Sequence, residues 1–165
     1  MKALETMWTS DLQSRLHPTI IFDLDGTLAI IDERREKATL PNGKMDWKTF
    51  FDPANIELDK PNLPLINVFR SLAAAGWRVG VFSGRDAISF NETLEWLKKH
   101  RVLVNFIRMR PIGSNTPDEV IKKQWLDEEL NAGEEIMCVF DDRDKVVKMW
   151  RDNGILCMQV NYGNF

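Results

Sequence analysis

Short apolar runs alternate with amphipathic segments along most of this chain. Runs rich in β-branched and aromatic residues are typical of buried strands, and they lie at residues 19–23, 78–82, 102–109, 136–140 and 155–160. Periodic apolar positions predict helices at residues 62–75, 86–100 and 146–152, and from Asn115-Thr116-Pro117-Asp118 onward. Strands that alternate with helices indicate βαβ units, so we predict an α/β fold. Its core would be a doubly wound, Rossmann-like parallel sheet with helices on both faces.

Two stretches depart from this alternation. Residues 1–17 are predicted to form a short amphipathic helix or a mobile arm, without recognisable chemistry. Residues 29–60 have too little apolar periodicity for a separate domain, and Pro41-Asn42-Gly43 within them is a turn signal. We expect this stretch to be a small flap, or insert, that follows the first strand and lies over the C-terminal edge of the sheet. The 165 residues fit a single domain spanning 1–165.

Composition and charge narrow the class of protein. The chain is 44% hydrophobic and 28% charged, which is ordinary for a globular protein. Its formal net charge of -3 argues against a protein that coats long stretches of nucleic acid, but it is compatible with a site for one phosphate or one nucleotide. Cys138 and Cys157 lie in apolar runs, and no CxxC motif, signal peptide or membrane span is recognisable. We therefore expect a cytoplasmic protein without a membrane partner.

The first predicted strand ends in two carboxylates, Asp23 and Asp25, which Gly26 follows at once. Side chains alternate along a strand, so these two residues point to the same side. They would emerge at the C-terminal end of the strand, where open α/β sheets bind ligands. A simple Asp-Gly turn is the alternative interpretation. Two carboxylates at such a position either share a metal ion or divide the acid and base roles between them.

Two further predicted strands also end in polar clusters, Ser83-Gly84-Arg85 and Asp141-Asp142-Arg143. In a parallel sheet these ends lie on one edge, so the carboxylates and the hydroxyl would converge there. Crowded carboxylates repel one another unless a cation holds them, and oxygen ligands suit Mg²⁺. Lys122 lies one turn after a predicted helix start, near the same edge.

These residue types are suited to phosphoryl transfer. One Asp carboxylate can attack phosphorus and form an aspartyl-phosphate, and a second can protonate the leaving oxygen and later activate water. Mg²⁺, Lys and Arg can balance the charge of the transferring group. A hydroxyl and backbone N–H groups can hold its remaining oxygens.

The order of these motifs resembles that of the haloacid dehalogenase superfamily of phosphohydrolases, from about residue 19 to the end. More narrowly, the chain resembles the 3′-phosphatase domain of phage-type polynucleotide kinases. The motifs that carry the two resemblances are Asp23-x-Asp25-Gly26-Thr27, Arg34, Ser83-Gly84-Arg85, Asp118 four residues before Lys122, Asp141-Asp142-Arg143, and the ending Gln159-Val160-x-x-Gly163-x-Phe165.

The resemblance implies a role for each residue at the predicted sheet edge. Asp23 would be the nucleophile and Asp25 the general acid and base, while Asp141 and Asp142 would hold Mg²⁺ together with Asp23 and the backbone of Asp25. Lys122 would contact the phosphoryl oxygens as part of the catalytic set.

The resemblance also implies a substrate-binding set. Ser83 and Gly84 would bind the phosphoryl group, Asp118 would orient Lys122, and Arg34 and Arg85 would contact the substrate or its phosphate. Lys123 is the rival of Lys122, and only the spacing from Asp118 favours Lys122.

The substrate is less determined than the chemistry. Residues 36–60 depart from the phage pattern and contain Trp47, which could stack on a base, as could Phe50; the alternative is that both aromatic residues pin the flap to the core. The chain carries no phosphate-binding Gly-x-x-x-x-Gly-Lys loop, so a kinase partner would be a separate one. We expect the substrate to be a 3′-phosphorylated nucleic-acid end or a nucleotide. The alternatives are a 5′-nucleotidase-like nucleoside monophosphatase, a phosphotransferase, and a binding module without catalysis.

Overall fold

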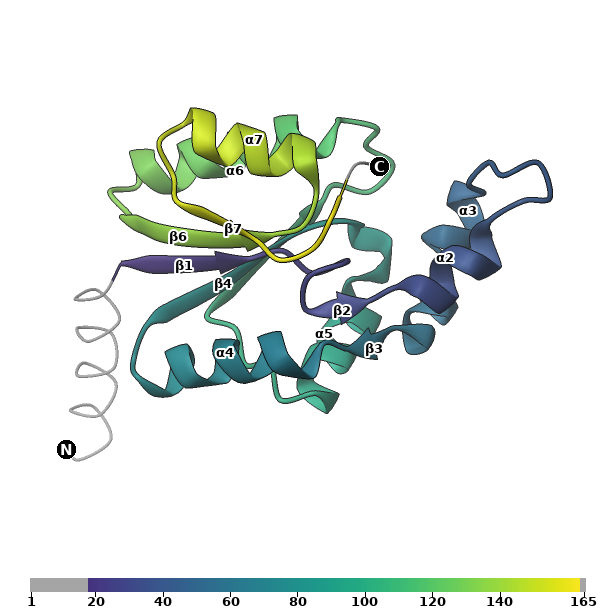
Figure 1. The fold of residues 1–165 in the computed structure, drawn as a ribbon, viewed down its shortest axis with the longest axis horizontal. Coiled ribbons are helices and arrows are strands. Elements are labelled where there is room, and N and C mark those ends of the chain that lie inside the picture. Colours follow the sequence, from purple (N-terminus) through teal and green to yellow (C-terminus); the bar gives the residue numbers. More distant parts are fainter. Residues whose placement is uncertain (1–17, 164–165) are drawn as a thin grey trace.

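The computed structural model describes residues 18–163, so the expectation for residues 1–17 lies outside the described residues. A five-stranded sheet with the order β5-β4-β1-β6-β7 forms the centre of the molecule (Figure 1), and every pairing in it is parallel. The strands are β1 (Thr19–Phe22), β4 (Arg78–Asp86), β5 (Phe106–Arg110), β6 (Ile136–Asp141) and β7 (Cys157–Gln159). The predicted α/β fold with a parallel, doubly wound sheet is confirmed.

Helices cover both faces of this sheet. Helices α4 (Leu63–Ala74) and α5 (Phe90–Lys99) lie on one face, and α6 (Asp118–Asn131) and α7 (Asp144–Asp152) lie on the other (Figure 1). Side chains of β1 point alternately to the two faces of the sheet, so they contribute to two separate parts of the core. Phe22 packs with Phe69 of α4 on one face. Ile21 belongs to the cluster on the other face, which contains Trp125 and Trp150. Trp96, Trp125 and Trp150 are buried.

Three element boundaries differ from the predicted ones. Strand β4 continues to Asp86, so Ser83-Gly84-Arg85 lies within the strand and not after it. Strand β5 begins at Phe106, because Arg101 adopts a positive φ of 52° and Val102 donates its N–H to Leu97 as the chain leaves α5. Helix α7 begins at Asp144, so Asp144 is its first residue and not its N-cap.

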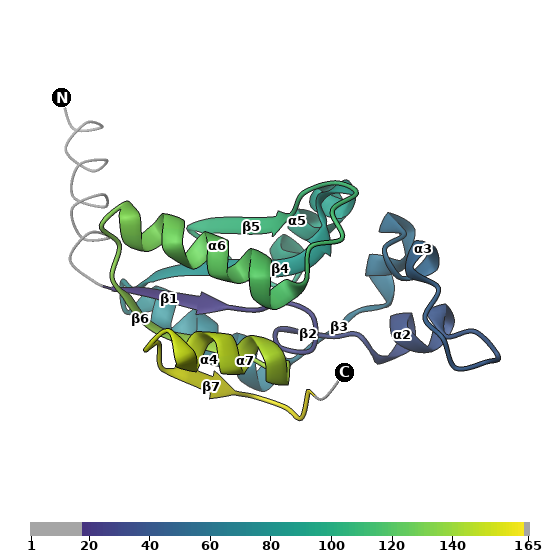
Figure 2. The ribbon, with the colours of Figure 1, turned by 90° about the horizontal axis from the view of Figure 1, so that it is seen from above.

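Residues 29–61 form a small cap beside the sheet. Strands β2 (Ala29–Ile30) and β3 (Lys60–Pro61) pair antiparallel as its stem. Between them lie α2 (Asp32–Ala38), α3 (Trp47–Phe50) and the 3₁₀ helix η1 (Pro53–Leu58). Figure 2 shows the cap beyond the C-terminal ends of the sheet strands, which is the edge where we expected a flap.

Helix length and composition bear on membrane insertion. Among residues 18–163, no helix is both long enough and apolar enough to span a bilayer.

Candidate active site

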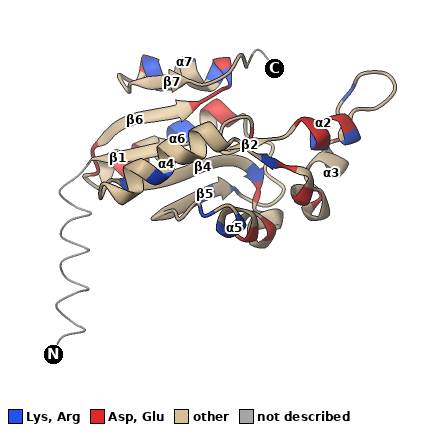
Figure 3. Ribbon diagram, turned by 60° about the horizontal axis from the view of Figure 1, so that its bottom comes forward, with Lys and Arg blue, Asp and Glu red and all other residues tan. Residues whose placement is uncertain are grey.

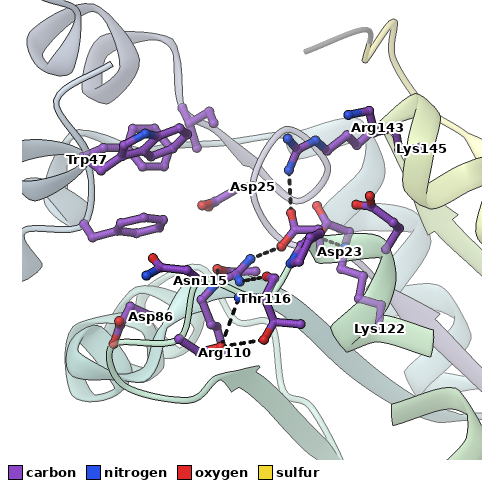
Figure 4. A pocket seen from close by; sticks show the side chains of 18 of the residues that line it. Asp23, Asp25, Trp47, Asp86, Arg110, Asn115, Thr116, Lys122, Arg143 and Lys145 are labelled. Carbon is purple, nitrogen blue, oxygen red and sulfur yellow. Dashed lines mark hydrogen bonds and ion pairs between the residues drawn. The ribbon is translucent and has the colours of Figure 1, made fainter. Parts of the chain in front are cut away.

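Neighbouring strand ends bring the predicted acidic residues together. Asp23 follows β1 directly, and Asp141 is the last residue of β6, which pairs with β1. The backbone N–H of Asp23 donates to the carbonyl of Phe140 at 2.8 Å, so the pairing of the two strands continues up to the acidic residues. Asp23 and Asp141 are buried at the base of the pocket drawn in Figure 4. Red segments mark this concentration of acidic residues at the end of β6 in Figure 3.

Asp23, Asp141 and Asp142 form an acidic triad. Each offers a carboxylate oxygen, and these oxygens all lie within 4.8 Å of one another. The Oδ2 atom of Asp23 is buried and has no hydrogen-bond partner among the described residues. A buried carboxylate oxygen without a partner is costly unless a cation takes it. The donor set consists of oxygen atoms only, so it fits a hard cation such as Mg²⁺.

The electrostatics of the triad agree with that fit. Burial and the charge of Asp141 raise the pKa of Asp142 from 3.8 to about 6. Burial also raises the pKa of Asp23 well above its usual value, and the attraction of Lys122 offsets this only in part. The carboxylates therefore repel one another in the protein alone, and a divalent cation would relieve that repulsion.

Lys122 points from α6 into the triad. Its Nζ donates to Asp23 Oδ1 at 2.6 Å and to Asp141 Oδ2 at 2.9 Å, and the side chain is buried. Burial alone would lower the pKa of Lys122, but the charges of Asp141 and Asp23 outweigh it and hold the pKa well above its usual value. Lys123 instead forms an exposed ion pair with Asp127. The geometry therefore selects Lys122 of the two predicted candidates.

Two arginines hold Asp25 in place. Arg85 donates through Nε at 2.7 Å, and Arg34 Nη2 lies 2.8 Å from the same carboxylate oxygen, Oδ1. Burial would raise the pKa of Asp25, but the charges of Arg34 and Arg85 outweigh it and keep the pKa well below its usual value. Asp25 is thus ionised in this arrangement, and the contacts of Oδ1 leave Oδ2 for a different partner.

Asp59 completes this group and was missed in the sequence. It contacts Arg34 Nε at 2.8 Å and also pairs with Arg85 Nη2, so Asp25, Arg34, Asp59 and Arg85 form a buried quartet. Asp59 lies in the cap just before β3 and belongs to no motif, so no local signal could have identified it.

The quartet corrects one expectation. Arg34 and Arg85 were predicted to contact the substrate, yet their side chains are fully buried and are not among the residues that line the pocket. They act on Asp25. Ser83 is likewise buried outside the lining, and its Oγ accepts the N–H of Arg85, whereas Gly84 next to it does line the pocket.

Asp118 has different partners from the expected one. It was predicted to orient Lys122, but it accepts hydrogen bonds from Arg110 and, at 2.8 Å, from Arg143 Nη1. Its carboxylate also lies against Gly84, where a Cβ would come within 2.3 Å of Oδ1. Arg143 thus pairs with a carboxylate of the pocket. Asp118 lines the pocket, so its influence on Lys122 is through space.

Two glycines allow close approach to Asp142, one to its side chain and one to its backbone. Gly26 has a positive φ of 85°, and a Cβ there would lie 2.1 Å from Asp142 Oδ2. A Cβ on Gly163 would lie 2.1 Å from the carbonyl oxygen of Asp142. The segment that contains Gly163 is tied to the same loop, because Asp144 N donates to Gly163 O at 2.8 Å and Val160 N donates to Asp141 O at 3.1 Å. The C-terminal segment thus supports the acidic loop from behind.

The pocket above the triad has a volume of about 490 Å³. Its base contains the triad, Lys122 and Asp25. Aromatic residues of the cap and the loop of residues 113–117 line it, and Figure 4 shows Arg143 and Lys145 on the side away from Trp47. The volume is within the range typical of small-molecule sites.

The two aromatic residues that we considered in the cap behave differently. Phe50 is 7% exposed, and the Arg34 guanidinium lies 4.4 Å from the centre of its ring, so Phe50 anchors the cap. Trp47 is 59% exposed and lines the pocket. The interpretation of an anchor therefore fits Phe50 and does not fit Trp47.

Comparison with protein families places this geometry in a known context. A family model described as the polynucleotide kinase PNKP phosphatase domain matches residues 17–165. The chain belongs to this family. Membership of the PNKP phosphatase family confirms the predicted resemblance and makes the protein a phosphatase of the haloacid dehalogenase type.

Individual relatives of this PNKP-family chain are longer proteins. A protein of Autographa californica nuclear polyhedrosis virus, which carries the name of a bifunctional polynucleotide kinase/RNA ligase, is 29% identical over 136 residues. The match covers 81% of this chain and 18% of the viral protein. A chain in the structure of the Pnkp1/Rnl/Hen1 RNA repair complex is 29% identical with a TM-score of 0.72, and the match covers 91% of this chain and 44% of that one. This chain thus spans less than half of either relative.

More distant structures share the fold. A haloacid dehalogenase-like hydrolase from Streptococcus pneumoniae superposes with a TM-score of 0.65 at 14% identity, over 87% of this chain and 84% of that one. D,D-heptose 1,7-bisphosphate phosphatase from B. bronchiseptica, solved with magnesium and phosphate, superposes with a TM-score of 0.56 at 12% identity, over 86% and 79% of the two chains.

Proposed function

We propose that this protein is a Mg²⁺-dependent phosphomonoesterase that removes the phosphate from the 3′ end of a nucleic acid. The observation that carries the proposal is the position of Asp23, whose buried Oδ2 lacks a partner at the base of a pocket, next to Asp25 and Lys122. Membership of the PNKP phosphatase family supports a nucleic-acid substrate.

The first half of the reaction breaks the phosphate ester. Asp23 attacks phosphorus through a carboxylate oxygen, the bond from phosphorus to the sugar oxygen breaks, and an aspartyl-phosphate remains. Asp25 delivers a proton to the departing oxygen. Since Arg34 and Arg85 keep Asp25 ionised in the free protein, Asp25 must first take up a proton from solvent, and the negative charge of the bound phosphate favours this protonation.

The second half releases phosphate. Asp25, now ionised, accepts a proton from a water molecule that attacks phosphorus, and the bond from Asp23 to phosphorus breaks. Lys122 keeps Asp23 oriented in both halves and balances the charge of the phosphoryl oxygens.

The acidic triad would hold the metal ion, with the backbone of Asp25 as a further ligand. Bound Mg²⁺ supplies positive charge that stabilises the phosphoryl group during transfer. Asp141 and Asp142 are buried at the end of β6, and the two glycines leave room for Asp142.

The experiment compares phosphate release from a 3′-phosphorylated oligonucleotide with release from 3′- and 5′-mononucleotides, with Mg²⁺ and with EDTA. We expect Mg²⁺-dependent release from the oligonucleotide, and none from Asp23→Asn. Turnover only of free nucleotides would refute the polynucleotide substrate. Unchanged turnover by Asp23→Asn would refute the aspartyl-phosphate mechanism.

A nucleoside monophosphatase is the second candidate. The observation that favours it is the pocket of about 490 Å³, which would accommodate a single nucleotide between Trp47 and the loop of residues 113–117. The same comparison of substrates decides between the two candidates, because a nucleoside monophosphatase would prefer the free nucleotide.

The names of the longer relatives suggest which reactions accompany the phosphatase reaction. Since the viral relative is named as a kinase and ligase and the solved relative belongs to an RNA repair complex, we infer that a kinase partner supplies the complementary end chemistry. This chain should then show phosphatase activity but no 5′-kinase activity. Transfer of phosphate from ATP to a 5′-hydroxyl end by this chain alone would contradict the inference.

A further inference from the structure

One tryptophan of the cap lines the pocket and remains largely exposed. Trp47 is 59% exposed, whereas Trp96, Trp125 and Trp150 are buried in the core. A large aromatic side chain that stays exposed inside a concave site leaves apolar area unburied, which is typical of a surface that a ligand covers. The ligand that shares this pocket with the phosphate site is the substrate itself.

The ring of Trp47 is held as a platform. Phe51 stacks on it with a centroid distance of 5.7 Å and an interplanar angle of 20°, and Phe50 packs edge-on at 5.7 Å. Phe50 is in turn fixed against Arg34 of the quartet. Helix α3 starts at an N-cap, Asp46, which accepts from Lys48 N at 3.1 Å and from Thr49 Oγ1 at 2.7 Å. The platform is therefore ordered before any ligand arrives.

The loop of residues 113–117 is a further part of the pocket lining, and it is also ordered. Trp47 and Asn115 both line the pocket, and in Figure 4 Asp25 and Asp23 lie further inside than Trp47. Arg110 donates to the carbonyls of Gly84 and Thr116, and Gly113 N donates to Asp86 Oδ2 at 2.8 Å, which fixes both ends of the Asn115 loop. This side of the pocket is therefore also fixed before any ligand arrives.

We propose that Trp47 stacks on the nucleobase of the nucleotide that carries the scissile phosphate. This inference rests on the proposed function and adds how the enzyme recognises the end of its substrate. Every base has a π face, so stacking on Trp47 would bind all four bases. The enzyme would thus require a base at the terminal position without selecting its identity.

Two substrates and three variants test the inference. The substrates are a 3′-phosphorylated oligonucleotide and the same oligonucleotide with a tetrahydrofuran abasic residue at its 3′-terminal position. The variants are Trp47→Ala, Trp47→Phe and, as a control, Tyr162→Ala, because Tyr162 is 96% exposed and lies outside the pocket lining. The melting temperature of each variant checks its folding.

For the wild type, removal of the base should raise KM about tenfold or more, which corresponds to the loss of one base–aromatic stack. Trp47→Ala should show the same rise on the intact oligonucleotide and no further rise on the abasic one. Trp47→Phe should recover most of the affinity, and Tyr162→Ala should resemble the wild type.

Two results would distinguish a failure of this inference from a failure of the proposed function. Equal KM values of wild type and Trp47→Ala on the intact oligonucleotide would overturn the inference alone. A wild-type enzyme that hydrolyses no 3′-phosphorylated oligonucleotide would overturn the proposed function and the inference with it.

Discussion

Lys122 donates a hydrogen bond of 2.6 Å to Asp23 from a buried position on α6. Replacing it by methionine keeps most of the volume and removes the charge, so Asp23 loses its orienting partner. We expect Lys122→Met to lower kcat by about 100-fold or more, as loss of a charge-stabilising donor does in other active sites. Steady-state kinetics with a 3′-phosphorylated oligonucleotide measure this change.

Lys123 provides the matched control. Its exposed pair with Asp127 contributes little, so Lys123→Met should leave kcat and the melting temperature nearly unchanged. A similar loss of kcat in both variants would show that the effect is not specific to the lysine in the triad.

The acidic triad predicts how the metal-free protein responds to pH. The folded state holds the pKa of Asp142 at about 6, against 3.8 for a free side chain, so between these values the folded protein binds more protons than the unfolded one. Its free energy of unfolding should therefore fall as pH rises from about 4 through 6. Melting curves in EDTA for wild type and Asp142→Asn isolate this contribution as their difference.

Added Mg²⁺ should raise the melting temperature above pH 6 in the wild type and much less in Asp142→Asn, because ligand binding stabilises the folded state. A wild-type protein that gains stability relative to Asp142→Asn between pH 4 and 6 in EDTA would have the wrong sign for a raised pKa.

The quartet predicts that Asp59 matters more than its sequence context indicates. Asp59→Asn leaves Arg34 and Arg85 buried with one carboxylate fewer, and the loss of one partner of a buried ion pair costs about 3–5 kcal/mol. Denaturant unfolding measures this loss. Glu33→Gln is the control, since the Lys60–Glu33 pair in the same cap is exposed and should contribute less than about 1 kcal/mol.

Gly163 predicts a link between the C-terminal segment and the acidic loop. A methyl group at this position would meet the carbonyl of Asp142 at 2.1 Å, so Gly163→Ala must displace the loop and should destabilise the protein by about 1–3 kcal/mol. It should also weaken Mn²⁺ binding measured by calorimetry. Tyr162→Ala, one residue away, should change neither quantity, and unaltered Mn²⁺ binding by Gly163→Ala would refute the link.

The sequence predicted best what depends on local pattern. The buried strand before Asp23 and the strand before Asp141 were correctly placed, because apolar runs of β-branched and aromatic residues have few other uses. Parallel topology then brought Asp23 and Asp141 to one edge, as a rule of the fold class requires. Lys122 followed from its motif spacing, and the structure places it in the triad.

The predictions from sequence were least accurate for side chains whose partners lie in distant segments of the chain. The resemblance to phage-type phosphatases assigned Arg34 and Arg85 to the substrate or its phosphate. Their real partners include Asp59, which is 25 and 26 positions away and carries no motif. Asp118 was similarly assigned to Lys122 by helical spacing. In the structure it forms ion pairs with Arg110 and Arg143.

The quartet also bears on how substrate enters the pocket and how product leaves it. Arg34 and Asp59 belong to the cap, and Asp25 and Arg85 belong to the sheet edge, so a cap that swung outward would separate buried charges from their partners. These ion pairs oppose an outward swing of the cap, so we expect it to act as a fixed wall of the pocket. We then also expect that no closing or opening of the cap limits turnover.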